Sequence, residues 1–186
     1  TNVVVGGNLL IFKLQPMRYL FVFSFVLVAL FYLCLNTQAQ VQNKSYGLLL
    51  KGMYKKTVPT ISVPQLKQIQ NKVVLLDTRE TKEYNISHLL GAICVGYEHF
   101  DTQKVLLLDP QTPIVLYCSV GYRSERIGER LLAMGFTNVR NLYGGVFEWV
   151  NQKGVLVDNG QQTTQRIHAY DKKWGVWLQE GIKVYE

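Results

Sequence analysis

The chemically distinctive stretch of this 186-residue chain begins at Cys118 and ends at Arg123. An apolar run typical of a strand, residues 114–117, stops at the cysteine, and an amphipathic helical pattern follows the arginine. A strand, a tight loop and a helix start direct backbone N–H groups to one point, where an anion is stabilised. We therefore expect Cys118 to ionise below the ordinary thiol pKa of about 8.5. This stretch predicts a reaction centre.

The loop between Cys118 and Arg123 contributes four residues: Ser119, Val120, Gly121 and Tyr122. We expect the N–H groups of residues 119–123 to surround an anion or a sulfur atom carried by Cys118. Gly121 lets the backbone curl so that these donors point inward. Arg123 is permanently charged and fork-shaped, so it is expected to hold an oxyanion bidentately at the pocket mouth.

The elements that must position this loop follow from alternating apolar and amphipathic segments. Five runs have strand character: residues 59–63, 73–76, 92–95, 113–117 and 139–142. Helical patterns lie between and after them: residues 63–70, 80–87, 123–134 and 146–150. Strands that are apolar on both faces and alternate with helices predict an α/β fold with a parallel sheet covered on both sides.

Functional sites in such sheets lie at the carboxyl ends of strands, where Cys118, Asp77 and Arg79 are all expected. In the helix after the loop, Ile127, Leu131 and Met134 are expected to share one face, and Gly135 is expected to end the helix.

Composition limits the partners. The net charge is +7, or +5 without Lys13 and Arg18 near the N-terminus, and no run of Lys or Arg exists. This balance favours small anionic substrates over nucleic acid. The three cysteines form no C-x-x-C pair and the three histidines are scattered, so neither a structural zinc site nor another cofactor is expected.

Residues 19–35 carry no charge, follow Arg18 and precede small residues that end at Ala39. This pattern predicts a secretory signal peptide cleaved after Ala39, with translation starting at Met17. Export to a bacterial periplasm is the expected location. The alternative is an uncleaved anchor that holds the protein in the membrane, facing the periplasm.

Three regions follow the segment 1–39. Residues 40–56 are interpreted as a linker with one helical turn, residues 57–153 as the folded domain, and residues 154–186 as an extension that packs on it. In the extension Trp174, Trp177 and Leu178 would share a helical face. That face adds core or, in the alternative, docks a partner.

The segment from Cys118 to Arg123 resembles the six-residue active loop of rhodanese-type sulfurtransferases. Three further stretches are similar to the family in the same order: residues 75–79 (LLDTR), 83–92 (EYNISHLLGA) and 141–149 (NLYGGVFEW). Ser87 and Leu89 depart mildly from the family's usual glycine and isoleucine. Over residues 57–153 the resemblance implies a three-layer rhodanese-like fold, with a central parallel five-stranded sheet and helices on both faces.

The resemblance implies a thiosulfate sulfurtransferase. The Cys118 thiolate would attack a small anionic sulfur donor, release sulfite and keep a persulfide, which cyanide, a thiol or a protein acceptor then removes. Ping-pong kinetics are expected. Membrane contact is expected only if the N-terminal segment stays uncleaved.

Other residues receive structural roles. Asp77 and Arg79 are interpreted as a loop-bracing pair, with a contribution of Arg79 to the field at the pocket as the alternative, and Ser124 is a secondary loop residue. His88 is expected to make a structural hydrogen bond. Cys94 is expected in the core, too far from Cys118 for a disulfide if the strand order follows the family.

Two rival functions stay open. Related phosphatases also use a cysteine, a backbone cradle and an arginine, but their loops have five residues between Cys and Arg, which make a wider bowl for phosphate. The four residues here favour sulfur transfer. The second rival is a persulfide carrier or binding module for a partner in the cell envelope, against which the intact pair of Cys118 and Arg123 argues.

Overall fold

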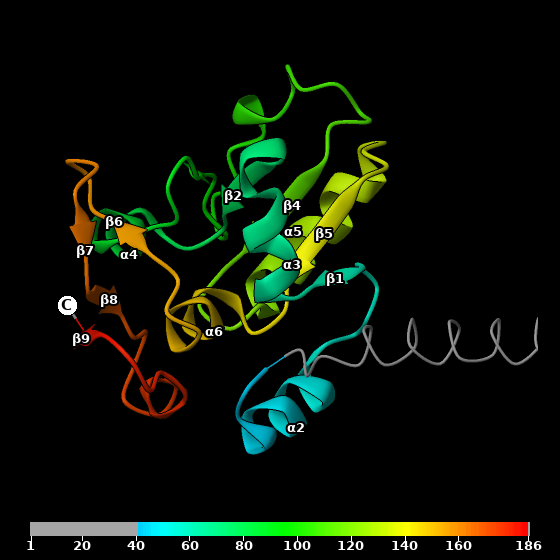
Figure 1. Ribbon diagram of the computed structural model, residues 1–186. Helices are drawn as coiled ribbons and strands as arrows, with labels where there is room; N and C mark the ends of the chain where they lie inside the picture. The colour runs from blue at the N-terminus through cyan, green and yellow to red at the C-terminus, as the bar shows by residue number, and fades with distance from the viewer. Residues whose placement is uncertain (1–40, 186) are drawn as a thin grey trace, which may run out of the picture. The chain divides into compact units, whose positions relative to one another are not determined.

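The computed structural model describes residues 41–185, and these residues build a parallel sheet with helices on both faces (Figure 1). The strands of the sheet are β1 (Thr60–Ile61), β2 (Val74–Asp77), β3 (Ile93–Cys94), β4 (Ile114–Tyr117) and β5 (Val139–Leu142). Their spatial order is β1-β5-β4-β2-β3, and every pairing is parallel. The predicted five-stranded parallel sheet is therefore confirmed, and it places β4 at its centre.

The helices follow the strands in alternation. They are α3 (Val63–Ile69), α4 (Thr81–Ile86), α5 (Tyr122–Ala133) and α6 (Gly145–Asn151), with the short 3₁₀ turns η1 (Gln70–Lys72) and η2 (Thr102–Lys104). Local chemistry sets their starts. Ser62 and Gln65 exchange hydrogen bonds in a capping box at α3, and a proline occupies its first turn.

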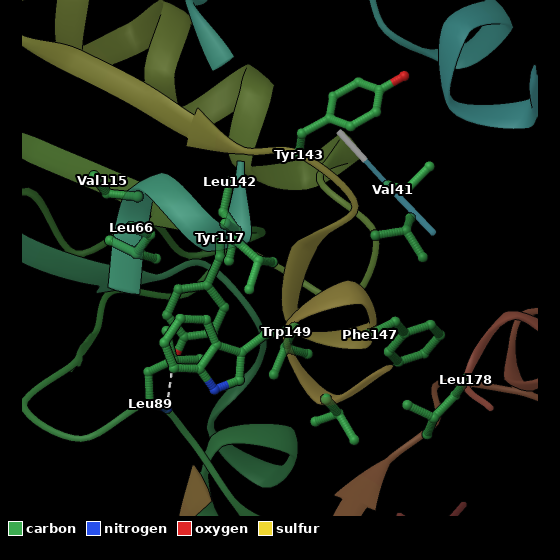
Figure 2. Packing of buried hydrophobic residues seen from close by; sticks show 14 of the residues in the cluster. Val41, Leu66, Leu89, Val115, Tyr117, Leu142, Tyr143, Phe147, Trp149 and Leu178 are labelled. Carbon is green, nitrogen blue, oxygen red and sulfur yellow. Dashed lines mark hydrogen bonds between the residues drawn. The ribbon is translucent and has the colours of Figure 1, made fainter. Parts of the chain in front are cut away.

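The two faces of the sheet carry separate cores. Val115 and Tyr117 of β4 pack with side chains of α3 and α6, whereas Leu116 packs on the opposite face with Ile127 and Leu131 of α5. The period of two along β4 sends alternate side chains to opposite faces. Figure 2 shows the first core, where the buried Tyr117 hydroxyl accepts the Leu89 N–H at 3.1 Å.

Met134 does not join the buried face of α5. The helix ends at Ala133, and Met134 stands at the cap with 40% of its surface exposed. The next residue, Gly135, turns the chain away at a φ of 96°. Ile127 and Leu131 therefore form the buried face of α5, and the expectation that Met134 shares this helical face is wrong because the helix ends one residue before it.

The segment interpreted as a linker contains a ten-residue helix, α2 (Lys44–Met53), capped by the Asn43 side chain. Tyr46 and Leu50, one turn apart, are fully buried in the core on the α6 side of the sheet. This differs from the single helical turn expected. Two apolar side chains at helical spacing within a polar sequence are only a weak signal for a helix. The helix α2 forms because these side chains pack against the rest of the fold.

The C-terminal region folds as short strands rather than as a helix with an apolar face. It contains β6 (Leu156–Val157), β7 (Thr163–Thr164), β8 (Arg166–His168), the 3₁₀ turn η3 (Gly175–Trp177) and β9 (Ile182–Val184). Leu178 is buried, and Trp177 stacks on Tyr46 with ring centroids 5.4 Å apart. The expected apolar contribution is present, but the helical face that was to carry it is not.

The N-terminal segment 1–39, with the predicted signal peptide, lies outside the described residues. Within residues 41–185, no helix combines the length and the apolar composition that a membrane crossing requires.

Candidate active site

Cys118 lies directly after β4, at the carboxyl end of the central strand, and only 1% of its surface is exposed. Its Sγ accepts the backbone N–H of Gly121 at 3.0 Å. Its carbonyl oxygen accepts the N–H of Val146 at 2.8 Å, which ties the start of α6 to the loop. The thiol is thus held by the loop that the sequence predicted, with one backbone donor on the sulfur.

Two glycines allow this close packing. Gly121 has a φ of 98°, and a Cβ at this position would overlap the hydroxyl of Tyr54. Gly145 has a φ of 59°, and a Cβ there would overlap the carbonyl oxygens of Cys118 and Ser119. Both positions therefore exclude side chains on conformational and steric grounds. The expectation that Gly121 lets the loop curl agrees with this geometry.

Tyr54, just after α2, joins the loop to the β5–α6 turn. Its hydroxyl donates to the carbonyl oxygen of Val120 at 2.7 Å and accepts the N–H of Gly144 at 3.1 Å. Burial raises the pKa of Tyr54 well above the ordinary phenol value, so the hydroxyl keeps its proton for the bond to Val120. The loop is thereby supported from a segment that precedes the predicted domain.

Asn141 of β5 supports the loop from the other side. Its Nδ2 donates to the Gly121 carbonyl oxygen at 2.8 Å, and its Oδ1 accepts the Ser124 hydroxyl at 2.7 Å. Both Asn141 and Ser124 are fully buried. The loop and the start of α5 are therefore connected to the neighbouring strand through one amide side chain.

Arg123 is paired with a carboxylate instead of facing the pocket with a free fork. Its Nη1 and Nη2 donate to the two oxygens of Glu83, each at 2.7 Å, and Nη2 also donates to the Ser119 hydroxyl at 3.1 Å. The expected bidentate contact of Arg123 with an oxyanion stays a prediction, and in this structure both terminal nitrogens are bound to Glu83. Glu83, from α4, already occupies that fork, and its buried charge requires such a partner.

The pair shifts both ionisations. Burial alone would raise the pKa of Glu83, but the hydrogen bonds and the charge of Arg123 lower it to about 2. Burial alone would lower the pKa of Arg123, but the bonds to Glu83 raise it above its ordinary value. Both groups are therefore charged across the physiological pH range.

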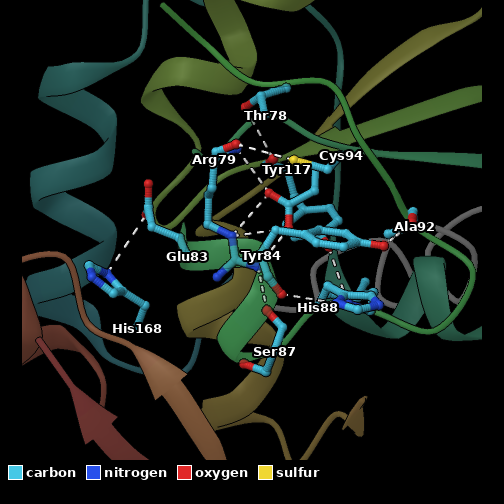
Figure 3. A network of polar contacts seen from close by, with 12 residues as sticks. Thr78, Arg79, Glu83, Tyr84, Ser87, His88, Ala92, Cys94, Tyr117 and His168 are labelled. Atoms are coloured by element: carbon cyan, nitrogen blue, oxygen red, sulfur yellow. Dashed lines mark hydrogen bonds and ion pairs between the residues drawn. The ribbon is translucent and has the colours of Figure 1, made fainter. Parts of the chain in front are cut away.

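Asp77 and Arg79 form a second, fully buried ion pair, with Nη2 and Oδ2 2.6 Å apart. Arg79 also donates from Nη2 to the carbonyl oxygen of Ser87 at 2.6 Å, which connects the end of β2 to the end of α4 (Figure 3). Neither residue lines the pocket around Cys118. This arrangement fits the bracing role, and it braces α4, the helix that supplies Glu83.

His88 and Cys94 also lie apart from the pocket. The His88 ring stacks on Tyr84, with centroids 3.7 Å apart, and its Nδ1 is 3.0 Å from the Tyr84 carbonyl oxygen. Cys94 is half-buried on β3, so the expectation that it lies in the core is wrong, because β3 is an edge strand of the sheet. Strand β2 separates β3 from β4. Burial raises the pKa of the Cys94 thiol. Cys94 and Cys118 are both free thiols.

A pocket of about 690 Å³ opens over Cys118. The loop contributes Ser119, Val120, Tyr122 and Arg123 to its lining. Glu80, Lys82 and Glu83 come from α4 and the residue before it, and Tyr97 and Glu98 come from the segment after β3. The remaining walls come from outside the predicted domain: Met53 of α2 and His168, Tyr170 and Trp174 of the C-terminal region. Figure 3 shows His168 directed at Glu83, with Nδ1 4.0 Å from Oε1.

No group of three or more His, Cys, Asp or Glu in residues 41–185 could hold a metal ion. The chemistry that the pocket supports is that of a thiol with a backbone donor on its sulfur, beside a guanidinium and a lysine.

The fold and this loop are those of a known class. The family model of the rhodanese-like domain matches residues 62–152. An uncharacterised protein of Bacillus subtilis, YqhL, is 30% identical over 90 residues, which cover 48% of this chain and 71% of that protein. The chain belongs to the rhodanese-like domain family.

Larger relatives contain a matching segment. The adenylyltransferase and sulfurtransferase UBA4 of Meyerozyma guilliermondii is 31% identical over 100 residues, which cover 50% of this chain and 24% of that protein. The tRNA uridine(34) hydroxylase of Wigglesworthia glossinidia brevipalpis is 32% identical over 88 residues, which cover 45% of this chain and 28% of the hydroxylase. The chain thus spans about a quarter of the length of these two relatives, and the family includes both sulfurtransferases and hydroxylases.

The fold agrees with solved structures. The rhodanese-like domain of the Anabaena protein Alr3790 superposes with a TM-score of 0.50 at 23% identity, covering 54% of this chain and 79% of that domain. The likeness supports the three-layer architecture described above.

Sequence reasoning missed three of the residues that shape the site. Glu83 lies in a segment that resembles the family, but no local pattern connects it with Arg123, which is 40 residues away. Asn141 is a polar residue inside an apolar strand, which predicts a specific hydrogen-bond role. Tyr54 had no local signal, because its two partners are 66 and 90 residues away.

Proposed function

We propose that the protein is a sulfurtransferase that carries a sulfane sulfur on Cys118. The observation that supports this most directly is the thiol itself: Sγ accepts the Gly121 N–H at 3.0 Å and shares a pocket with Arg123. A backbone donor that stabilises a thiolate is equally placed to stabilise the terminal sulfur of a persulfide after a small shift. Family membership agrees, because sulfurtransferases are among the relatives.

The first half-reaction transfers sulfur to the enzyme. The Cys118 thiolate attacks the outer sulfur of the donor, a new S–S bond forms, and the bond between the donor's two sulfurs breaks. With thiosulfate the electron pair leaves on sulfite, and the persulfide on Cys118 takes the remaining negative charge. No proton transfer is needed, so the pocket requires no general base.

The second half-reaction returns the thiolate. A nucleophile attacks the outer sulfur of the persulfide and the electron pair returns to Cys118 Sγ. Cyanide yields thiocyanate, and a thiol yields a new persulfide. Because the donor product leaves before the acceptor binds, ping-pong kinetics are expected.

We further propose that this reaction takes place outside the cytoplasm. The uncharged run of residues 19–35 and the small residues before Gln40 support export through a cleaved signal. N-terminal sequencing of protein from the native cell tests this. A mature N-terminus at Gln40 is the expected result, and a chain that retains residues 19–35 would show the anchor instead.

The decisive comparison sets sulfur transfer against phosphate hydrolysis. Thiocyanate production from thiosulfate and cyanide is measured beside hydrolysis of an aryl phosphate, for the wild-type protein and for C118S. We expect thiocyanate only from the wild type and no Cys118-dependent hydrolysis. Hydrolysis that exceeds sulfur transfer and is lost in C118S would replace this proposal with a phosphatase.

A further inference from the structure

The C-terminal region forms a wall of the Cys118 pocket although it lies outside the segment 62–152 that the family model matches. Tyr170 and Trp174 line the pocket from this side. The guanidinium of Arg123 lies 5.2 Å from the centre of the Tyr170 ring. A wall in contact with the loop arginine is in a position to select the substrate.

The backbone holds Tyr170 in an unusual conformation. Its φ is 64°, in the left-handed region that residues with a side chain rarely adopt, and its N–H donates to Nδ1 of His168 at 3.1 Å. Nevertheless, 48% of the tyrosine is exposed at the pocket rim. A strained backbone that presents a partly exposed aromatic ring to a pocket indicates that Tyr170 contacts a ligand and does not serve the core.

The charge of the lining disfavours a doubly charged donor. Glu80, Glu83 and Glu98 face two cations, Lys82 and Arg123, so the lining carries a formal charge of −1 before Cys118 ionises. The terminal nitrogens of Arg123 are already bound to Glu83. A thiosulfate dianion would have to compete with this buried carboxylate for the same guanidinium.

The size and the surface of the pocket point the same way. A volume of about 690 Å³ lies within the range of about 300–1,000 Å³ in which proteins hold organic ligands. Four aromatic side chains line it: Tyr97, Tyr122, Tyr170 and Trp174. Thiosulfate is little larger than sulfate and has no apolar surface that could pack against these aromatic rings. A donor with an organic group has such a surface.

We propose that residues 168–174 are the specificity element of this pocket. They select a singly charged sulfane-sulfur donor with an apolar organic group over thiosulfate. This inference rests on the proposed function, because it names the donor class for the Cys118 reaction. With a thiosulfonate, R–SO₂–S⁻, the Cys118 thiolate attacks the outer sulfur, the S–S bond breaks, and the sulfinate R–SO₂⁻ leaves. One negative charge then stays on the persulfide.

Binding to the unreactive C118S protein tests the proposal without turnover. Benzenethiosulfonate, methanethiosulfonate and thiosulfate are titrated by calorimetry or by NMR. The two thiosulfonates have the same charge and the same reacting group, so their ratio isolates the aromatic group. We expect the Kd of benzenethiosulfonate to be at least about tenfold below that of methanethiosulfonate, and thiosulfate to bind weakest.

Variants locate the effect. In C118S/Y170A and C118S/W174A the ratio should fall to about twofold or less. V176A in the same background is the control, because Val176 lies in η3, is 62% exposed and does not line the pocket. Trp174 packs against the core, so a thermal melt checks that C118S/W174A is folded. If this variant unfolds, C118S/Y170A alone carries the test, because Tyr170 is half-exposed.

Each result has one meaning. Equal Kd values for the two thiosulfonates, tightest binding of thiosulfate, or a ratio that Y170A leaves unchanged would overturn the specificity proposal. Failure of the proposed function gives a different pattern: the wild type forms no thiocyanate from any of the three donors, while the binding preference of C118S is present.

Discussion

At the scale of single residues, the ion pair between Glu83 and Arg123 controls the charge beside Cys118. Glu83 is 1% exposed, and its two oxygens take up the terminal nitrogens of the arginine. Burial of a carboxylate costs several kcal/mol of solvation free energy, and the charge and hydrogen bonds of Arg123 offset this cost. The ion pair therefore keeps both side chains in position. The loop arginine thus serves the architecture of the site as well as its charge.

The lowered pKa of Glu83 predicts how stability depends on pH. Its folded-state pKa is about 2, below the ordinary value of 4.5, so the ion pair stabilises the fold fully above pH 4.5. That contribution is lost as the pH falls through about 2. It amounts to about 3 kcal/mol in the free energy of unfolding.

E83Q tests this prediction by urea unfolding between pH 7 and pH 2. We expect E83Q to be less stable than the wild type by about 2 kcal/mol at pH 7, and the difference to shrink as the pH falls below about 4.5. E180Q, which changes an exposed glutamate, is the control and should follow the wild type. A difference between E83Q and the wild type that stays constant with pH would contradict the assignment.

The spacing from Cys118 to Arg123 made the loop predictable from sequence, because all of its residues are local. The partner of Arg123 was not predictable, since Glu83 is 40 residues away and only the folded α4 brings it near. The same holds for Asn141, whose contact with Gly121 spans 20 residues. Long-range polar contacts depend on packing that no local pattern specifies.

At the scale of elements, the loop after β4 is fixed by contacts from α2, β5 and α6. Tyr54 bonds to Val120 and Gly144, and Asn141 bonds to Gly121 and Ser124. These bonds satisfy buried backbone groups that the tight loop leaves without partners in regular structure. The geometry around the thiol is therefore determined by three elements of the fold.

Y54F should loosen this arrangement. The phenylalanine leaves the Val120 carbonyl oxygen and the Gly144 N–H buried without their partner, which costs about 1–3 kcal/mol. We also expect kcat/KM for thiocyanate formation to fall about tenfold. Y143F is the matched control, because within residues 41–185 the Tyr143 hydroxyl forms no hydrogen bond. Equal stability and activity in the two variants would refute a supporting role for Tyr54.

G121A should be far more damaging than G135A. The two glycines have nearly the same φ, 98° and 96°, but a Cβ at Gly121 meets Tyr54 whereas a Cβ at Gly135 meets open space. G135A therefore measures the backbone strain alone, about 1 kcal/mol. We expect G121A to cost at least about 2 kcal/mol more and to abolish sulfur transfer. Thermal unfolding and the thiocyanate assay check this, and equal losses in the two variants would show that the contact with Tyr54 is unimportant.

At the scale of the whole molecule, two segments outside the matched domain complete the site. Met53 and Tyr54 come from the N-terminal side, and Tyr170 and Trp174 come from the C-terminal side. The parallel sheet was predictable because its central strands, β2 and β4, are apolar runs and the strands alternate with helices. The role of the flanking segments could not be predicted, because their apolar residues are sparse and their contacts form only when the domain has folded.

The central claim is that Cys118 carries the sulfur, and mass spectrometry of the intact protein tests it most directly. Incubation with a sulfane-sulfur donor should add about 32 Da, the mass of one sulfur atom. Peptide mapping should place that sulfur on Cys118 and none on Cys94, and cyanide should remove it. A protein that gains no mass with any donor, or that gains it on Cys94, would contradict the account.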